Sequence, residues 1–173
     1  PLMGSVDLIV PIWTMGQISK EQWAGLNKAV YDGAGVAGFH GGMIDAFRDN
    51  VQYQFMCGGQ WVAHPGNCIP EYTVNVTDAS HEITQGIGDF KLTDTEQYYC
   101  HVDPGVHVLC TTTFSGEHGD PSLYPVGTVM PYAWTRTWGK GRVFVASWGH
   151  TYKDFDVPEA RRIVERGMTW ATR

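Results

Sequence analysis

Three side chains in this sequence have the chemistry of an acid/base centre or a metal site: His40, Glu96 and His150. His40 stands at a glycine turn that ends the apolar segment 35–39, and His150 follows a second apolar segment, 143–147. The carboxyl ends of parallel strands meet at one edge of an α/β sheet, so the two imidazoles are expected to face the same rim. Two imidazoles and a carboxylate are the minimum for a divalent-metal site or an acid/base pair. We therefore predict that these three residues are catalytic.

The turn at His40 also excludes one class of chemistry at this position. Strand-to-helix elbows of this kind often carry a serine or cysteine nucleophile at the apex. A histidine occupies the apex here, so proton transfer or metal ligation is the expected chemistry. A divalent metal, Zn²⁺ or Mn²⁺, is compatible with the three residues, but the sequence does not decide whether one binds. The alternative is structural: each histidine caps its strand through backbone hydrogen bonds, and Glu96 is a solvated loop charge.

Five further residues are candidates for contact with a substrate: Arg48, His64, His101, Trp13 and Trp148. The planar guanidinium of Arg48 suits a hydroxyl-rich or anionic ligand. It suits an ion pair with Asp45 or Asp49 equally well, and such a pair would fix the loop instead. His64 precedes a proline in a turn, where a structural role is the alternative. Trp13 ends the first predicted strand and Trp148 stands beside Gly149-His150, and the indoles of both are suited to stacking on a sugar ring, with a place in the core as the alternative.

The apolar pattern indicates the elements that must position these residues. The run Val6–Ile12 is typical of a central parallel strand. Ser19 and Gln22 have the spacing of a capping box at a helix N-terminus, and Gly33 follows the expected end of that helix. Together with a strand at Val36–Phe39, this gives a strand–helix–strand unit.

The rest of the chain is predicted to form further strands and helices of the same domain. Helices are expected at 44–56 and from 158 onward, strands at 72–76, 106–113, 131–138 and 142–148, and a covering loop at 114–129. The glycines at 139–141 indicate a hairpin between the last two strands. The pattern as a whole predicts an α/β fold: a three-layer sandwich with a mostly parallel, doubly wound sheet and one antiparallel hairpin at an edge.

Composition and charge narrow the class of protein. A chain of 173 residues is expected to form one domain, 1–173. The net charge of −6 argues against nucleic-acid binding, and no apolar run approaches the roughly 18 residues of a membrane span. Without a signal peptide or a CxxC pair among its four cysteines, the chain is expected to be cytoplasmic with reduced thiols; two disulfides are the alternative. Doubly wound sheets normally begin with a β-α-β segment, so we expect that the natural protein has one before this chain; a fold with fewer strands is the alternative.

A series of short motifs runs through nearly the whole chain: Gly38–Gly42, Asp45–Arg48, Gly58-Gly59, His64-Pro65, His81–Thr84, Glu96–Tyr99, Gly139–Phe144 and Gly149-His150. In this order they resemble the trehalose-utilisation (ThuA-like) family. The resemblance implies a class I glutamine-amidotransferase-like fold and a role in bacterial sugar catabolism, with trehalose-derived or related 3-keto-glycosides as substrates. It implies functional positions at His40, Arg48, His64, Glu96 and His150. Because His40 occupies the place of the amidotransferase nucleophile, glutaminase activity is not implied.

Two main hypotheses follow for the function. The first is an enzyme that acts on a small-molecule carbohydrate with His40, Glu96 and His150 at the rim of the sheet. The second is a carbohydrate- or metabolite-binding module without catalysis, since members of a common fold often keep a pocket and lose the reaction. A metal-dependent hydrolase unrelated to sugars is a weaker third hypothesis. The sequence leaves the substrate and the oligomeric state open, a homo-oligomer included.

Overall fold

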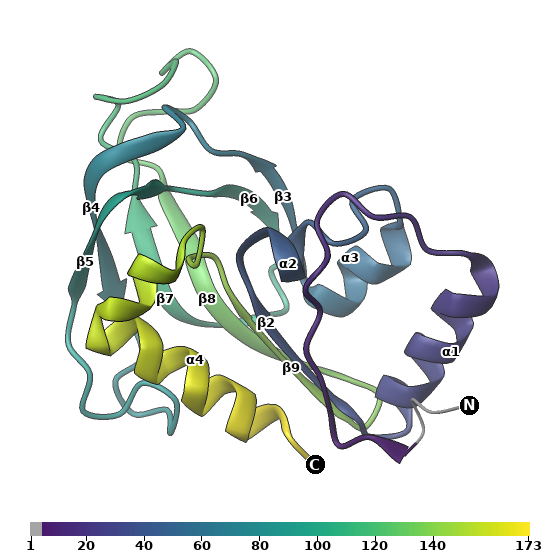
Figure 1. The fold of residues 1–173 in the computed structure, drawn as a ribbon. Helices are drawn as coiled ribbons and strands as arrows, with labels where there is room; N and C mark the ends of the chain where they lie inside the picture. The colour runs from purple at the N-terminus through teal and green to yellow at the C-terminus, as the bar shows by residue number, and fades with distance from the viewer. Residues whose placement is uncertain (1–4) are drawn as a thin grey trace.

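The structure is a computed structural model that describes residues 5–173 (Figure 1). Its elements in chain order are β1 (Leu8–Ile9), α1 (Lys20–Tyr31), β2 (Gly35–Phe39), α2 (His40–Ile44), α3 (Val51–Cys57), β3 (Gly59–Ala63), β4 (Cys68–Val76), β5 (Phe90–Glu96), β6 (Tyr99–Val102), β7 (His107–Thr113), β8 (Val129–Trp138), β9 (Gly141–Ala146), the 3₁₀ helix η2 (Tyr152–Asp156) and α4 (Pro158–Ala171). The predicted domain also includes residues 1–4, which lie outside this range. Within it, no helix is long and apolar enough to cross a membrane.

Seven strands form one mixed sheet in the order β1-β2-β9-β8-β7-β4-β5. Only β1–β2 and β2–β9 pair in parallel, and the other four pairings are antiparallel. The sheet curls into a half-barrel toward its β4–β5 end (Figure 1). A separate antiparallel pair, β3–β6, lies beside it.

The prediction of a mostly parallel, doubly wound three-layer sandwich of the class I glutamine-amidotransferase type is therefore wrong. Parallel neighbours that follow each other in the chain need a crossover of a dozen or more residues, usually a helix. The segment with α1 is such a crossover, but the later neighbours β4–β5, β7–β8 and β8–β9 are joined without a helix in the described chain. The hairpin around Gly139 is present, yet its two strands lie in the middle of the sheet instead of at an edge.

The β1–α1–β2 unit forms largely as its sequence predicts. The amide of Gln22 donates to Ser19 Oγ at 3.2 Å, and the amide of Ser19 donates to Gln22 Oε1 at 2.9 Å, which completes the capping box. Gly33, at φ +124°, follows the helix. The strand β1 differs from its prediction, because it has two residues and lies at the edge of the sheet instead of its centre.

Helices cover both faces of the parallel part of the sheet. Gly141 of β9 packs against the backbone of α1, where an added Cβ would lie 2.4 Å from the Val30 carbonyl. Phe144, three residues along, points to the opposite face and packs on Gly167 of α4. Since side chains alternate along a strand, α1 and α4 lie on opposite faces of β9. The arrangement of helix, sheet and helix in three layers is thus limited to the part of the sheet formed by β1, β2 and β9.

Two other predicted elements differ in detail. The single helix expected at 44–56 is two short helices, α2 and α3, separated by a turn at 45–50. The loop expected to cover a site packs against the turn that follows β3, since a Cβ added at Gly119 would lie 2.7 Å from Pro65 Cβ and 2.8 Å from the Gly66 nitrogen. The loop therefore borders His64, which precedes that turn.

Candidate functional site

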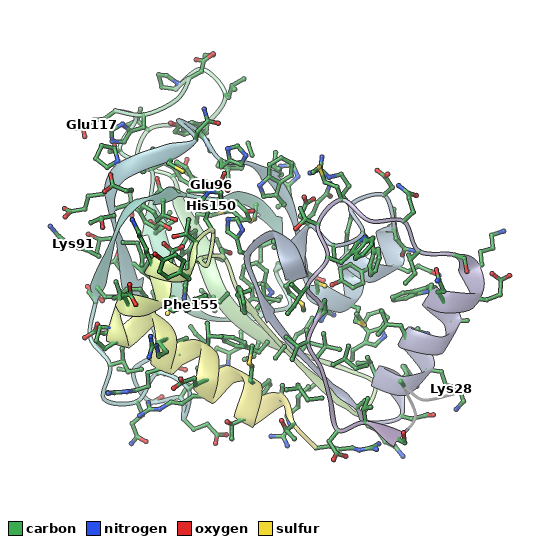
Figure 2. The ribbon with its side chains drawn as sticks, in the orientation of Figure 1. Lys28, Lys91, Glu96, Glu117, His150 and Phe155 are labelled. Atoms are coloured by element: carbon green, nitrogen blue, oxygen red, sulfur yellow. The ribbon has the colours of Figure 1, made fainter. Side chains whose placement is uncertain are left out.

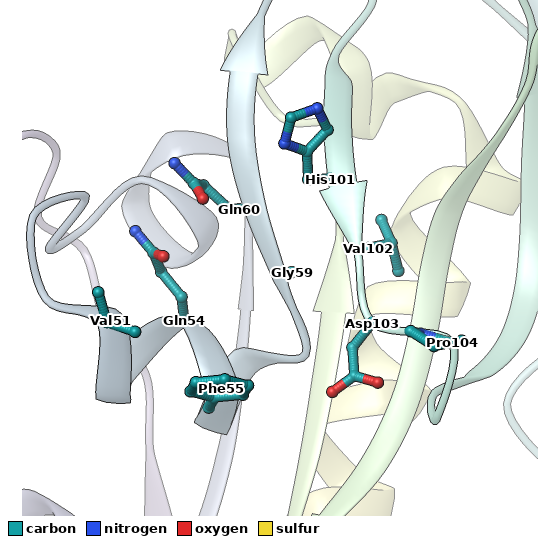
Figure 3. Close-up of a pocket in the computed structure, with 9 residues that line it drawn as sticks. All are labelled: Val51, Gln54, Phe55, Gly59, Gln60, His101, Val102, Asp103 and Pro104. Carbon is teal, nitrogen blue, oxygen red and sulfur yellow. The ribbon is translucent and has the colours of Figure 1, made fainter.

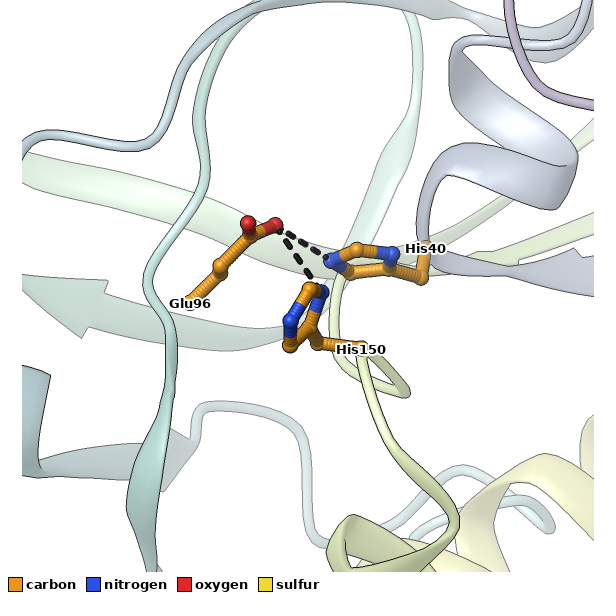
Figure 4. A group of neighbouring side chains, drawn as sticks. All are labelled: His40, Glu96 and His150. Atoms are coloured by element: carbon orange, nitrogen blue, oxygen red, sulfur yellow. Dashed lines mark ion pairs between the residues drawn. The ribbon is translucent and has the colours of Figure 1, made fainter. Parts of the chain in front are cut away.

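The structure brings His40, Glu96 and His150 together at one rim of the sheet (Figure 4). Glu96 Oε2 lies 3.1 Å from His40 Nε2 and 3.3 Å from His150 Nδ1. The other carboxylate oxygen, Oε1, lies 3.7 Å from Nε2 of a third histidine, His64. Two of the four side chains are largely buried, at 13% exposure for His40 and Glu96, whereas His64 and His150 are about one-third exposed. Solvent therefore reaches the cluster mainly at His64 and His150.

His40 is held in a strained backbone conformation between β2 and α2. Its φ is +50°, in the left-handed region that residues other than glycine rarely adopt, at a cost of about 1–3 kcal/mol. The following residue, Gly41, allows a close approach, because an added Cβ would lie 3.2 Å from both Thr14 Oγ1 and the Tyr98 hydroxyl. The sharp turn thus places the imidazole at the rim of the sheet, next to Glu96.

Tyr98 fixes the ring of His40. The two rings stack with centroids 4.1 Å apart, and the phenol oxygen lies 3.0 Å from His40 Nδ1. The opposite nitrogen, Nε2, is buried and has no aligned hydrogen-bond partner although Glu96 is near. Burial, together with the nearby His150 and His64, lowers the pKa of His40 to about 3. At neutral pH, His40 is therefore an uncharged base or ligand.

Two buried tyrosine hydroxyls fix the backbone at Glu96, the last residue of β5. Tyr72 donates to the Glu96 carbonyl at 2.9 Å, and Tyr132 lies 3.3 Å from the same oxygen. The Tyr132 hydroxyl also accepts from the amide of Tyr98 at 3.3 Å. Burial raises the pKa of Tyr72 well above its ordinary value, so this phenol stays a donor. The carboxylate and the ring that stacks on His40 are thus held by one network.

Asp154 of η2 positions His150. It is 3% exposed, and its Oδ2 accepts from the amides of Gly149 and His150, both at 2.9 Å. The same oxygen accepts from the hydroxyl of Thr95 at 3.0 Å. Because Thr95 directly precedes Glu96, one buried carboxylate ties the His150 loop to the strand that carries Glu96.

Arg48 takes the ion-pair alternative. Its Nε and Nη2 donate to the two carboxylate oxygens of Asp45 at 2.9 and 2.6 Å, and these bonds raise the pKa of Arg48. The guanidinium also lies 4.6 Å from the ring centre of Trp61. That indole neighbours His64 and Tyr98, with ring centres 5.6 and 6.1 Å away. Arg48 therefore packs against an aromatic side chain beside the site, and two of its nitrogens, Nε and Nη2, already donate to Asp45.

His101 lies outside the cluster. It faces an open pocket of about 380 Å³ that forms beside α3 and β6 (Figure 3). Phe55, Gln60 and Asp103 line the same pocket, and none of the three clustered residues does. The position five residues after Glu96 does not return to the rim because β6 pairs with β3 in the separate two-stranded sheet.

The two tryptophans differ in their surroundings. Trp148 is fully buried, packs on Phe90 and Tyr132, and donates from Nε1 to the Ala160 carbonyl at 3.3 Å. It is a core residue with no ring face for a sugar. Trp13 is 61% exposed, and its amide donates to the carbonyl of Gly42 at 3.4 Å. Its indole is therefore available to solvent beside the turn that carries His40.

Two residues that complete the site were not predicted as functional, Tyr98 and Asp154. Tyr98 lies two residues after Glu96, and an aromatic residue this close to a candidate acid is a usable signal. Asp154 has the weaker signal of a carboxylate just after a glycine–histidine pair, where it can accept from the amides of a turn. Their role depends on tertiary contacts that span 58 and 59 residues, to His40 and Thr95.

Comparison with known protein families identifies one family for this chain. A sequence model of the ThuA family, described as trehalose utilisation, matches residues 2–171. Proteins described as ThuA-like from Parabacteroides merdae and Bacteroides uniformis each have a TM-score of 0.73 at 17% identity, over 99% and 95% of this chain and 74% and 69% of theirs. A cytoplasmic protein from Salmonella typhimurium has a TM-score of 0.67 at 11% identity, over 99% of this chain and 74% of its own. No curated protein matches the sequence. At these identities the solved structures establish the fold alone.

Proposed function

The chain belongs to the ThuA family of trehalose utilisation, and on this basis we propose that it is a sugar-catabolic enzyme that acts on a trehalose-derived or related 3-keto-glycoside. The observation that carries the proposal is the approach of two imidazole nitrogens to one carboxylate oxygen, at 3.1 and 3.3 Å. A carboxylate beside imidazoles provides groups that can take up and return a proton in general acid/base catalysis. Figure 2 shows Glu96 and His150 within the curl of the sheet.

The reaction that fits these groups is an elimination. A ketone at C3 of the sugar acidifies the hydrogen on C2, and the neutral imidazole of His40 or the carboxylate of Glu96 removes that proton. The electron pair forms an enolate, whose collapse breaks the bond between C1 and the glycosidic oxygen. The departing oxygen takes a proton from a second acid, for which the more exposed His150 and His64 are placed. The products are an unsaturated 3-keto sugar and the released alcohol.

One part of this scheme needs a group other than Arg48. The guanidinium donates from Nε and Nη2 to the two oxygens of Asp45, so these two donors are not available to an enolate oxygen. Stabilisation of that charge therefore has to come from the groups around His40.

The test is turnover of 3-keto-trehalose and a panel of 3-keto and ordinary glycosides by the purified protein. We expect release of the aglycone sugar from the keto substrates and a loss of at least about 100-fold in Glu96→Gln, the usual effect of removing a general base. Glu117→Gln is the matched control, since Glu117 is an exposed residue on the outer loop (Figure 2). No turnover of any glycoside, with or without added Zn²⁺ or Mn²⁺, would contradict the proposal.

The exposed indole of Trp13 beside the His40 turn favours a second candidate, a carbohydrate-binding module without catalysis. A sugar that stacks there would be oriented by His40 without reacting. The distinguishing measurement is sugar affinity in His40→Ala and Trp13→Ala. Weaker binding in both variants, with no reaction in the unaltered protein, would support the module and count against the enzyme.

A further inference from the structure

We infer that His40 Nε2, Glu96 Oε2 and His150 Nδ1 form a binding site for one divalent cation, Zn²⁺ or Mn²⁺. The inference deepens the proposed function, since it identifies the missing electrophile of that site. It concerns binding alone, so it can be tested without a substrate. Three observations support it: the spacing of the ligand atoms, the orientation of His40 and the open side of the cluster.

The spacing fits a metal polyhedron. For metal–ligand bonds of about 2.0–2.1 Å, the ligand atoms of a tetrahedral zinc site lie about 3.3 Å apart. Glu96 Oε2 lies 3.1 Å from His40 Nε2 and 3.3 Å from His150 Nδ1, and the three atoms all lie within 4.8 Å of one another. One ion can therefore contact all three with small side-chain movements.

The orientation of His40 leaves an acceptor that needs a cation. In a neutral imidazole, one ring nitrogen carries a proton and the other a lone pair. Tyr98 lies 3.0 Å from Nδ1, while buried Nε2 has no aligned hydrogen bond to the carboxylate 3.1 Å away. If Nδ1–H donates to the phenol oxygen, the Nε2 lone pair faces a carboxylate oxygen, and the two acceptors repel. A cation between them removes the repulsion, and it gives both buried acceptors a partner that compensates for their loss of water.

The contact with Tyr98 matches the usual support of a metal-binding histidine. Such a ring normally donates its other N–H to an oxygen, which fixes both the tautomer and the ring direction. The phenol oxygen of Tyr98 lies 3.0 Å from Nδ1, at hydrogen-bond distance, where it can accept that proton. We therefore treat Tyr98 as a positioning residue that acts through His40.

The cluster has the open side that a catalytic metal requires. Catalytic zinc sites use three protein ligands and leave a fourth position for water or substrate. His150 is 34% exposed, and His64, 3.7 Å from Glu96 Oε1, is 32% exposed. An ion bound here would act as a Lewis acid toward a sugar carbonyl. His64 would then remain free to move the substrate proton.

The experiment is calorimetric titration of chelator-treated, untagged protein with Zn²⁺ and, separately, Mn²⁺. We expect one ion per chain, a loss of at least 100-fold in affinity for Glu96→Gln, and a loss of about 10–100-fold for Tyr98→Phe, the range for supporting groups of metal ligands. His107→Asn is the matched control: His107 is exposed and pairs with Asp78 away from the cluster, so this variant should bind as the unaltered protein does. Circular dichroism and thermal unfolding of each variant establish that the fold is kept.

The outcomes separate this inference from the proposed function. Absence of binding for both ions, or equal binding by Glu96→Gln and the unaltered protein, overturns the metal site. If glycoside turnover then persists after chelation, the proposed function stands on acid/base chemistry alone. Tight binding of one ion without turnover of any glycoside supports the metal site and overturns the proposed reaction.

Discussion

Asp154 offers the sharpest test of how the site is held together. A single oxygen of this buried carboxylate accepts from the amides of Gly149 and His150 and from the Thr95 hydroxyl, at 2.9–3.0 Å. Asp154→Ala removes the acceptor and leaves three donors without a partner. Asp154→Asn can present an amide oxygen at the same position, so it removes the charge and keeps the geometry.

The expected cost follows from these three bonds. A buried polar group without a partner costs about 1–3 kcal/mol. Because the loop is partly open to water at His150, we expect a loss near the lower part of the summed range, about 3–5 kcal/mol, for Asp154→Ala. Bonds to a charged acceptor are worth roughly 0.5–1 kcal/mol more than bonds to a neutral one, so the loss of charge at three bonds in Asp154→Asn should cost about 1.5–3 kcal/mol.

Urea unfolding followed by tryptophan fluorescence measures these values. With a slope of about 2 kcal/mol per molar urea, Asp154→Ala should lower the midpoint by about 1.5–2.5 M. Asp156→Ala is the control in the same 3₁₀ helix, since Asp156 is exposed and its ion pair with Arg161, at 3.9 Å, is long. This control should cost less than about 0.5 kcal/mol.

Two results would refute the reasoning. Equal midpoints for Asp154→Ala and Asp156→Ala would mean that the buried acceptor does not stabilise the loop. Equal costs for Asp154→Asn and Asp154→Ala would mean that charge, and not the shared acceptor position, accounts for the effect.

Two further predictions concern glycines and thiols. Gly149→Ala should lose at least about 2 kcal/mol in urea unfolding, because φ is +110° and the new Cβ would lie 2.6 Å from the Phe39 ring; a neutral result would contradict this backbone assignment. Gly25→Ala, on the exposed face of α1 with no atom near the new Cβ, should instead gain about 0.5–1 kcal/mol. Burial raises the pKa of three thiols from 9.0 to about 12: Cys57, Cys100 and Cys110. Above pH 9 the unfolded thiols ionise and the folded ones do not, so the free energy of unfolding should fall by up to about 1.4 kcal/mol per pH unit per thiol until the folded pKa. The pKa of the exposed Cys68 thiol is also raised, but less far, so Cys68→Ser should reduce this alkaline slope less than Cys110→Ser does. A flat profile between pH 8 and 10 would contradict the prediction.

The sequence was most informative where short-range rules apply. The capping box at Ser19 and the hairpin at Gly139 depend on neighbouring residues, and both are present. The placement of His40 and His150 at one rim followed from the expectation that their strands are parallel, and β2 and β9 do pair in parallel with Phe39 opposite Ala146. The order and direction of the remaining strands depend on long-range pairing, which the apolar pattern does not encode.

The role of Arg48 shows a second kind of limit. The sequence left two partners open, a ligand or a nearby carboxylate, because both need the same guanidinium. The choice of Asp45 over Asp49 depends on burial: Asp45 is 3% exposed and its carboxylate requires a paired charge. Trp148 was ambiguous for a similar reason, since stacking on a sugar and packing in a core use the same apolar ring.

The convergence of Glu96 on the two histidines depends on the curl of the sheet. Following the pairings from β9, strands β8 and β4 run opposite to it, while β7 and β5 run in its direction. The carboxyl end of β5, with Glu96, therefore lies at the same rim as the ends of β2 and β9. In a flat sheet, however, the five steps from β2 to β5 would separate those ends by about 24 Å, at roughly 4.8 Å per strand.

Two side chains cannot bridge such a gap, yet Glu96 Oε2 lies 3.1 Å from His40 Nε2. The half-barrel removes the gap, and its curvature has a local source in the β7–β8 pair. The register shifts there between Val108 and Cys110 and again at Thr111, and irregularities of this kind bend a strand and increase its twist. Antiparallel pairing in the second half of the sheet is thus what allows the bulges, the curl and a carboxylate from a distant edge strand to complete a site built on two parallel strands.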